Sequence, residues 1–113
     1  LELAKENRDI TVYGTGLQTR TFCYIDDHIE ATTKAFRDNV YNNEIINIGN
    51  NEETTVLQLA ETIIKILDSK SKIIHLDPLE EGDMTRRQPD VERMKSLLNR
   101  DFTSLEEGLK KII

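Results

Sequence analysis

Short β-branched runs alternate along this chain with longer runs of helical periodicity, and this alternation limits the fold more than any other feature. Residues 56–67 repeat apolar side chains at the three- and four-residue spacing of one helix face. Residues 9–13 (DITVY) and 72–77 (KIIHLD) are short and rich in Val and Ile, which is typical of strands. We therefore predict a single α/β domain over residues 1–113, with short strands and four or five helices.

The face predicted to be buried in the helix at 56–67 consists of Val56, Leu59, Ala60, Ile63 and Leu67. The other expected elements are extended runs at 21–25 and 44–49, helices at 27–38, 91–98 and 105–113, and the end of a helix before residue 9. In the helix at 27–38, the expected inner face consists of Ile29, Thr32, Thr33 and Phe36.

Polar residues mark the starts of three of these helices. Thr55 with Gln58, and Ser104 with Glu107, have the spacing of a capping box, in which each side chain bonds the backbone N–H of the other residue. Asp90 stands before a third helix as a simple cap. These signals predict where the helices begin.

Two adjacent carboxylates, Asp26 and Asp27, admit two interpretations. Paired carboxylates serve acid–base chemistry in many enzymes. Their place before a helix favours capping instead, because a carboxylate satisfies free N–H groups there, and Asp27 with Glu30 has the spacing of a capping box. We expect both aspartates to cap the helix at 27–38.

The composition argues against several functional classes. With 15 basic and 21 acidic residues the formal net charge is −6, so neither a nucleic acid nor an anionic membrane is expected as the main partner. A single cysteine, Cys23, excludes an intrachain disulfide and a cysteine-based zinc site, and a cytoplasmic location is the default. No apolar run approaches the roughly 20 residues of a membrane span. Because the chain starts at Leu1 in what resembles a helix under way, we expect it to be a fragment of a longer protein.

Two glycines and two histidines attract attention but indicate structural roles. Gly14 and Gly16 resemble part of a phosphate loop, yet the G-x-G-x-x-G spacing of dinucleotide sites fails at Thr19, which favours a tight turn. His28 and His75 each lack a partner at metal-ligand spacing. We expect no metal site.

Three arginines are harder to explain as ordinary surface residues. Arg20 lies between the glycine turn and an apolar run that contains Phe22, and a partly buried guanidinium needs anionic or carbonyl partners. Arg86 and Arg87 precede a helix start, where a cation is poorly placed for the helix dipole. Salt bridges, or one small anion held by planar donors, would account for them.

Four stretches carry a family resemblance in series. They are TVYGTGLQTRTFCYIDD (11–27), NIGNNEETTVLQLAE (47–61), RRQPD (86–90) and SLEEGLKKII (104–113). Together they resemble the C-terminal part of the NAD-dependent nucleotide-sugar epimerases, dehydratases and decarboxylases of the extended short-chain dehydrogenase/reductase superfamily. The branches most similar to this chain are the UDP-glucuronate decarboxylases and the dTDP-glucose 4,6-dehydratases.

The resemblance implies that the chain is a small substrate-binding domain, normally packed on an N-terminal Rossmann domain that is absent here. In the family the Rossmann domain binds NAD and carries a Tyr-x-x-x-Lys pair, which this sequence lacks, so no cofactor is expected in this chain. The implied partners are a UDP- or dTDP-sugar and the Rossmann domain, with self-association through the surface that the latter would cover.

The resemblance also assigns roles to six residues. Those expected to line the nucleoside are Thr11, Val12 and Tyr13. Those expected to contact the diphosphate are Arg20 and Arg87, and the residue expected to face the ribose hydroxyls is Asp90.

The reaction branch and the functional class stay open. The forms LQTR and RRQPD favour a UDP-glucuronate decarboxylase or a UDP-sugar 4-epimerase. The first alternative is a non-enzymatic interaction module whose arginines only make structural salt bridges. The second is a redox role for Cys23, which would require an accessible environment that favours the thiolate.

Overall fold

The computed structural model describes residues 1–80 and 85–113, which form two compact units. The first unit consists of Leu1–Arg20, Glu53–Arg87 and Leu109–Ile113, and the second of Thr21–Glu52 and Gln88–Gly108. The described residues contain five helices and four short strands, so the predicted α/β class is confirmed. None of the described helices has both the length and the apolar character that a membrane span requires.

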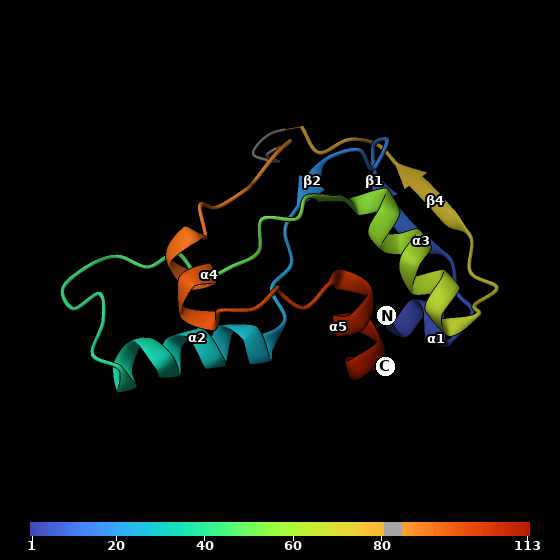
Figure 1. Cartoon of the computed structure of the whole chain (residues 1–113). Helices are drawn as coiled ribbons and strands as arrows, with labels where there is room; N and C mark the ends of the chain where they lie inside the picture. The colour runs from blue at the N-terminus through green and yellow to red at the C-terminus, as the bar shows by residue number, and fades with distance from the viewer. Residues whose placement is uncertain (81–84) are drawn as a thin grey trace. The chain divides into compact units, whose positions relative to one another are not determined.

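A parallel strand pair organises the first unit. Strand β1 (Ile10–Tyr13) pairs with β4 (Ile73–Leu76), with Ile10 opposite Ile73 (Figure 1). Helix α3 (Val56–Leu67) contacts β1 and the short α1 (Glu2–Lys5). Both strands occur where the β-branched runs predicted them.

Helix α3 forms as its sequence predicts. Thr55 and Gln58 make the reciprocal capping-box bonds, with the Thr55 side chain accepting from the Gln58 N–H at 3.0 Å. Ala60 and Ile63 are buried, and the other residues of the predicted face are half-buried. The helix ends at Asp68, whose φ of 48° is the left-handed conformation common at helix C-termini.

A second, smaller sheet lies in the same unit. Strand β2 (Thr19–Arg20) pairs antiparallel with β3 (Thr54–Thr55), and the register sets Thr19 opposite Thr55. The pairing places Arg20 at the end of a strand and Glu53 directly before the partner strand. This small sheet is the framework of the candidate site described below.

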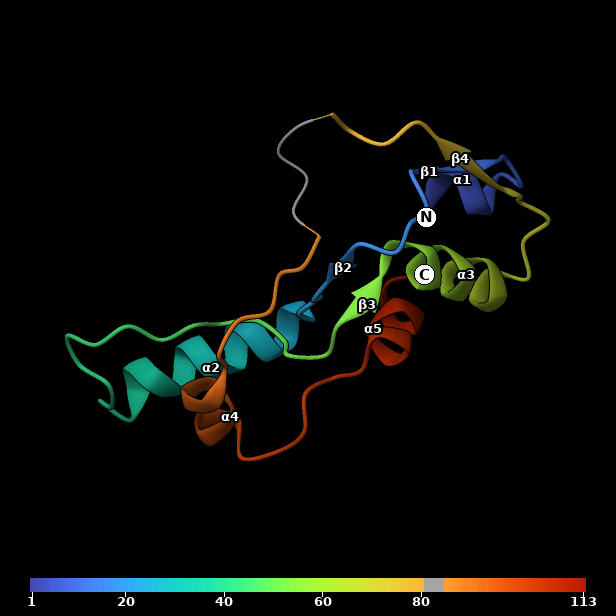
Figure 2. The ribbon, with the colours of Figure 1, turned by 90° about the horizontal axis from the view of Figure 1, so that it is seen from above.

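The second unit is built on two helices, α2 (Ile25–Arg37) and α4 (Glu92–Leu98), which lie side by side (Figures 1 and 2). Its core consists of Ala31, Val91, Met94 and Leu98, with Cys23, Ile48 and Phe102 packed against it. Burial of these aliphatic side chains is the main force that holds the unit together.

The predicted inner face of α2 is wrong. Ile29 is 53% exposed and Phe36 is 89% exposed, while Thr32 and Thr33 are also exposed. The residues of α2 that are buried are Asp27 and Ala31. The helix therefore turns a different face to α4 than its apolar pattern indicates, and an apolar face is left exposed.

The capping role predicted for Asp26 and Asp27 is also wrong. The residue at the N-cap of α2 is Tyr24, which makes no side-chain cap bond. Asp27 is only 1% exposed and accepts hydrogen bonds from Thr103 and Arg100. These distant partners draw the carboxylate away from its own helix terminus.

The two further extended runs do not form the strands that were predicted. Residues 21–24 have no regular structure and Ile25 already belongs to α2, while residues 44–49 lie outside the strands of the described chain. Side chains rather than a neighbouring strand bond the second run: Arg93 donates to the Ile45 carbonyl at 2.9 Å. This bond gives the Ile45 carbonyl a partner outside any sheet.

The last helix, α5 (Leu105–Ile112), begins as predicted. The Ser104 hydroxyl accepts from the Glu107 N–H at 3.3 Å, and the Glu107 carboxylate accepts from the Ser104 N–H at 3.2 Å. This second capping box is confirmed.

Candidate functional site

The candidate site begins with the glycine turn that follows β1. Gly14 and Gly16 have φ values of 60° and 73°, in the region that glycine adopts without strain. A side chain at Gly16 would also collide with the protein, because its Cβ would lie 2.7 Å from Cγ1 of Val12. The structural interpretation of these glycines as a tight turn is confirmed.

Carbonyl groups of the turn and of the residues after it accept hydrogen bonds from the first N–H groups of α3. The Leu57 N–H donates to the Gly16 carbonyl at 2.9 Å, and the Val56 N–H donates to the Gln18 carbonyl at 3.0 Å. Free N–H groups at a helix start are what a phosphate loop offers to its ligand. Since the turn already bonds these donors, the structure does not support a pyrophosphate site here.

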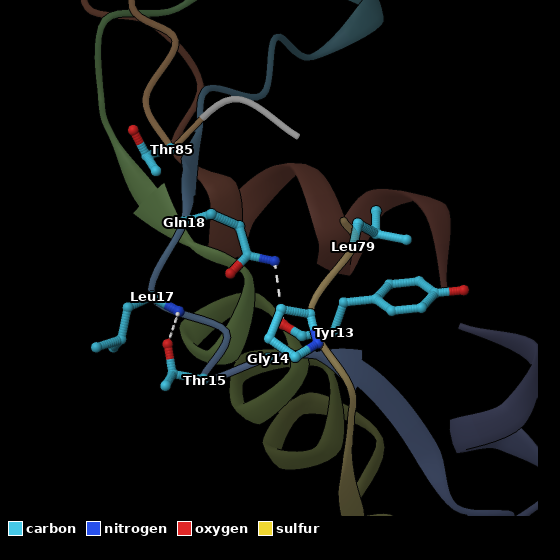
Figure 3. A pocket seen from close by; sticks show the side chains of 8 residues that line it. Tyr13, Gly14, Thr15, Leu17, Gln18, Leu79 and Thr85 are labelled. Atoms are coloured by element: carbon cyan, nitrogen blue, oxygen red, sulfur yellow. Dashed lines mark hydrogen bonds between the residues drawn. The ribbon is translucent and has the colours of Figure 1, made fainter. Parts of the chain in front are cut away.

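A cavity of about 390 Å³ opens beside the turn (Figure 3). Its lining residues are Tyr13, Gly14, Thr15, Leu17, Gln18, Pro78, Leu79 and Thr85. Leu17 and Thr15 lie on one side, and Tyr13 and Leu79 on the other. Apolar surfaces with a few hydroxyl and amide groups are typical of sites for small organic ligands, and the volume lies in the usual range of about 300–1,000 Å³.

The three residues predicted to line a nucleoside differ in their positions on β1. Tyr13 lines the cavity and is 47% exposed. Val12 is 2% exposed and packs beneath the turn, and Thr11 is exposed on the strand without lining this cavity. In this structure Tyr13 is therefore the member of the stretch that lines this cavity.

Arg20 lies two residues beyond the cavity residue Gln18 and is half-buried. One of its guanidinium nitrogens, Nη1, donates to the Thr19 carbonyl at 2.7 Å. The carbonyl partner expected for a partly buried guanidinium is thus present.

The other two arginines follow Thr85, and Arg86 bonds a carboxylate. Nε of Arg86 donates to Oε1 of Glu53 at 2.5 Å, and this bond lowers the pKa of Glu53 and raises that of Arg86. Arg87 is exposed. Of the two adjacent cations, Arg86 is the one held by Glu53.

A backbone hydrogen bond joins the segments that carry these arginines. The Thr19 N–H donates to the Thr85 carbonyl at 2.9 Å, directly beside the cavity that Thr85 lines. Arg20 immediately follows Thr19, and Arg87 comes two residues after Thr85. The first unit therefore brings both segments to one edge of the cavity.

Asp90 belongs to the second unit, where it acts at the start of α4. Its Oδ1 accepts from the Glu92 N–H at 3.1 Å, and its carbonyl accepts from the Asn47 side chain at 3.1 Å. The predicted N-cap residue, Asp90, lies one position before the observed N-cap, which is Val91. The ribose role of Asp90 stays a prediction.

Comparisons with known proteins agree with these motifs. Residues 1–49 match the model of the NAD dependent epimerase/dehydratase family. UDP-N-acetyl-alpha-D-glucosaminuronate decarboxylase from Bacillus cytotoxicus is 38% identical over all of this chain and 37% of its own length. The structure of UDP-glucose 4-epimerase from Thermotoga maritima, with UDP-glucose, superposes with a TM-score of 0.83 at 30% identity, over 96% of this chain and 35% of that one. UDP-glucuronic acid 4-epimerase from Bacillus cereus, in complex with UDP-glucuronic acid and NAD, gives 0.80 at 31% identity, over 96% and 35% of the two chains.

The chain is similar to members of the NAD-dependent epimerase/dehydratase family. The resemblance inferred from the four sequence stretches is therefore confirmed. The chain spans about a third of the length of the relatives it matches. Its relatives and structural neighbours are nucleotide-sugar epimerases, dehydratases and decarboxylases.

Several residues of the cavity carry no sequence signal that identifies them. Pro78 and Leu79 follow β4, which pairs with the distant β1, and Thr85 bonds the distant Thr19. Gln18 could have been suspected from its place two residues before Arg20. Glu53 could not, since nothing in the sequence pairs it with Arg86.

The environment of Cys23 argues against a redox role. Burial, followed by the charge of Asp27, raises the pKa of its thiol. The side chain is half-buried against the core of the second unit. A reactive cysteine needs the opposite conditions, with a lowered pKa and ready access.

The histidines have no metal-binding context in the described residues. His75 bonds the Gly14 carbonyl through Nδ1 at 2.7 Å, so it helps to hold the turn. The described part of the chain contains no group of three or more His, Cys, Asp or Glu side chains that could hold a metal ion.

Proposed function

We propose that the chain is the C-terminal substrate-binding domain of an NAD-dependent nucleotide-sugar epimerase, dehydratase or decarboxylase. In this proposal the cavity beside β1 receives the nucleoside, and Arg20 and Arg87 hold the diphosphate. The substrate is a UDP- or dTDP-sugar. The alternative is a non-enzymatic α/β module in which the arginines make structural salt bridges, as Arg86 does with Glu53.

The observation that carries the proposal is the path of the two cavity walls. One wall runs through Gln18 and leads to Arg20, and the other runs through Thr85 and leads to Arg87. Each arginine is two residues beyond the wall, and the Thr19–Thr85 hydrogen bond holds the walls together at that point. A nucleoside diphosphate has the matching order, with a flat base and ribose followed by two charged groups.

The chemistry of each part suits such a ligand. Tyr13 and Leu79 offer apolar surface to a base, while Gln18 and Thr85 offer polar groups to its edge or to the ribose. Guanidinium groups bind phosphate through two parallel N–H donors, which gives both strength and a fixed geometry. The net charge of −6 makes such focused cations necessary for an anionic ligand.

The residues of this chain do not fit the dinucleotide itself. The glycine turn lacks the dinucleotide spacing, and its carbonyls bond the first N–H groups of α3. We therefore assign NAD to the Rossmann domain of the proposed enzyme. In that enzyme this chain would bind and orient the nucleotide half of the substrate.

Titration of the isolated chain with UDP and with NAD tests this division of roles. We expect UDP to bind and NAD to show no measurable heat, with no turnover of any UDP- or dTDP-sugar. Uridine, which lacks the phosphates, should bind more weakly than UDP because it cannot reach the arginines. Tight binding of NAD to the chain, or equal binding of UDP and uridine, would contradict the proposal.

The exposed apolar face of α2 suits the surface that the Rossmann domain would cover. Ile25, Ile29 and Phe36 lie along it at helical spacing and are 53–89% exposed. We expect the isolated chain to self-associate through this face, because exposed contiguous apolar surface favours association.

Light scattering over a range of concentrations checks this prediction. Replacing Phe36 by Glu should reduce the apparent mass of the chain at high concentration towards that of a monomer. The matched control is Ile45→Glu, which removes an 83% exposed apolar residue of the same unit outside α2. A chain that is already monomeric, or a control that acts as strongly as Phe36→Glu, would rule out α2 as the surface.

A further inference from the structure

We propose that Glu53 is a positioning residue for the diphosphate site: it holds the segment that carries Arg87 against the strand that carries Arg20. The inference rests on the proposed function, since it assigns a role to a residue that would not itself touch the ligand. It concerns the described residues of the first unit only.

Glu53 joins the two segments through one carboxylate oxygen. Oε1 accepts from Nε of Arg86 at 2.5 Å and from the Thr19 hydroxyl at 3.1 Å. The Glu53 side chain is 25% exposed, whereas that of Arg86 is 67% exposed. A well-covered carboxylate directly before β3 therefore holds a more exposed arginine, so Glu53 is the fixed anchor and residues 85–87 are the segment that it holds.

Thr19 and Glu53 together hold residues 85–86, and we call these bonds the tether. Its hydroxyl donates to Glu53, its N–H donates to the Thr85 carbonyl at 2.9 Å, and the β2–β3 register sets it opposite Thr55. Two independent hydrogen bonds therefore tie residues 85–86 to β2 and to the residue before β3. Arg20 and Arg87 are the residues next to these bonded positions along the chain.

The charges of the tether suit a site for an anion. A carboxylate near a diphosphate would repel it, but the Glu53 carboxylate is paired with Arg86, and this bond lowers the pKa of Glu53. The pair commits one of two adjacent guanidinium groups to the protein. The proposed function assigns the ligand contact to the adjacent Arg87.

Tethering matters for affinity because a long, exposed side chain loses conformational freedom when it binds. A segment that is already fixed has less freedom to lose, so the ligand binds more tightly than it would to a mobile segment. The same fixation sets the spacing of two planar donors, which a diphosphate requires.

The experiment compares Glu53→Gln, Arg86→Gln and the double variant with the unchanged protein. Calorimetric titration of the full-length protein with UDP and with uridine is the measurement. We expect each single variant to bind UDP about two- to tenfold more weakly, the cost of ordering one long side chain on binding. Uridine should bind as before. The double variant should lose no more UDP affinity than the single variant that binds UDP more weakly, because both changes remove the same interaction.

The matched control is Glu44→Gln, which breaks the 3.7 Å ion pair of Glu44 with Arg93 in the second unit. It should leave both affinities unchanged. Should Glu53→Gln fail to fold, Arg86→Gln decides, since it keeps the hydrogen bond between Glu53 and Thr19.

The outcomes separate this inference from the proposed function. If Arg87→Ala weakens UDP binding and the Glu53 and Arg86 variants do not, the positioning role is wrong and the proposed function stands. If UDP and uridine weaken equally in Glu53→Gln, the residue only supports the fold, and the inference is overturned. If Arg87→Ala has no effect either, the diphosphate site itself is wrong.

Discussion

Arg20→Ala should weaken the binding of UDP to the full-length protein by about ten- to a hundredfold. A hydrogen bond to a charged group contributes roughly 1.5–3 kcal/mol, and each 1.4 kcal/mol is about a tenfold change in affinity. Arg20 is the half-buried cation at the end of β2, two residues beyond the cavity wall. Calorimetric titration with UDP and dTDP measures the effect.

Arg87→Ala should have a similar effect, and lysine should restore the function of Arg20 only in part. Lysine keeps the charge but cannot offer two parallel donors to one phosphate. Arg20→Lys should therefore lie between the unchanged protein and Arg20→Ala. The matched control is Arg8→Ala, which removes an exposed arginine of the same unit whose ion-pair partner is Glu6 at 3.2 Å. It should bind both nucleotides normally.

Steady-state kinetics of the proposed enzyme would show how the binding energy is used. The diphosphate is remote from the sugar carbon that reacts, so loss of uniform binding should mainly raise KM. A smaller fall in kcat would show that the arginines also align the sugar. If both alanine variants bind both nucleotides as the unchanged protein does while still folded, these arginines are structural, and the interaction-module alternative is favoured.

Local sequence signals predicted the parts of this structure that local interactions determine. The capping boxes at Thr55 and Ser104 form because both partners lie within four residues of each other. The glycine turn is equally local, since the φ values of Gly14 and Gly16 suit few other residues. Such features need no knowledge of the rest of the chain.

The failures have the opposite cause. The partners of Asp27 lie 73 and 76 residues away, so a helix-start pattern could not reveal that the carboxylate would be buried. The sequence predicts that the apolar face of α2 is buried within the chain. Periodicity shows only which face of a helix is apolar. Which surface covers it depends on tertiary structure. The contribution of Pro78 and Leu79 to the cavity depends in the same way on the parallel pairing of β1 with β4.

The second large effect concerns the cluster of Asp27, Thr103 and Arg100. Asp27→Ala should lower the free energy of unfolding by roughly 2–4 kcal/mol, the usual cost of removing one partner from a buried polar network. The Asp27 carboxylate is 1% exposed and accepts from the Thr103 N–H at 2.7 Å, the Thr103 hydroxyl at 2.8 Å and Nη2 of Arg100 at 3.0 Å. Without it these donors lose their acceptor. The cost is limited because the Arg100 side chain is 41% exposed and retains Glu30.

Urea unfolding followed by circular dichroism measures this loss. The matched control is Asp26→Ala, which removes the exposed carboxylate next in sequence and should change stability little. Asp27→Asn should be intermediate, because an amide oxygen can still accept from Thr103. A variant Asp27→Ala as stable as Asp26→Ala would show that the cluster does not stabilise the fold.

The stabilisation by Asp27 should also depend on pH. Burial alone raises the pKa of this carboxyl, but the hydrogen bonds from Thr103 and the contact with Arg100 outweigh it, so the pKa is lowered on folding. A group with a lowered pKa stabilises the folded state above its unfolded pKa of about 3.9, and this contribution is lost as the pH falls through the folded value. The difference in stability between the unchanged protein and Asp27→Asn should therefore be full near neutral pH and should shrink below about pH 4. A difference that stays constant down to pH 2 would show that the charge of Asp27 is not what stabilises the cluster.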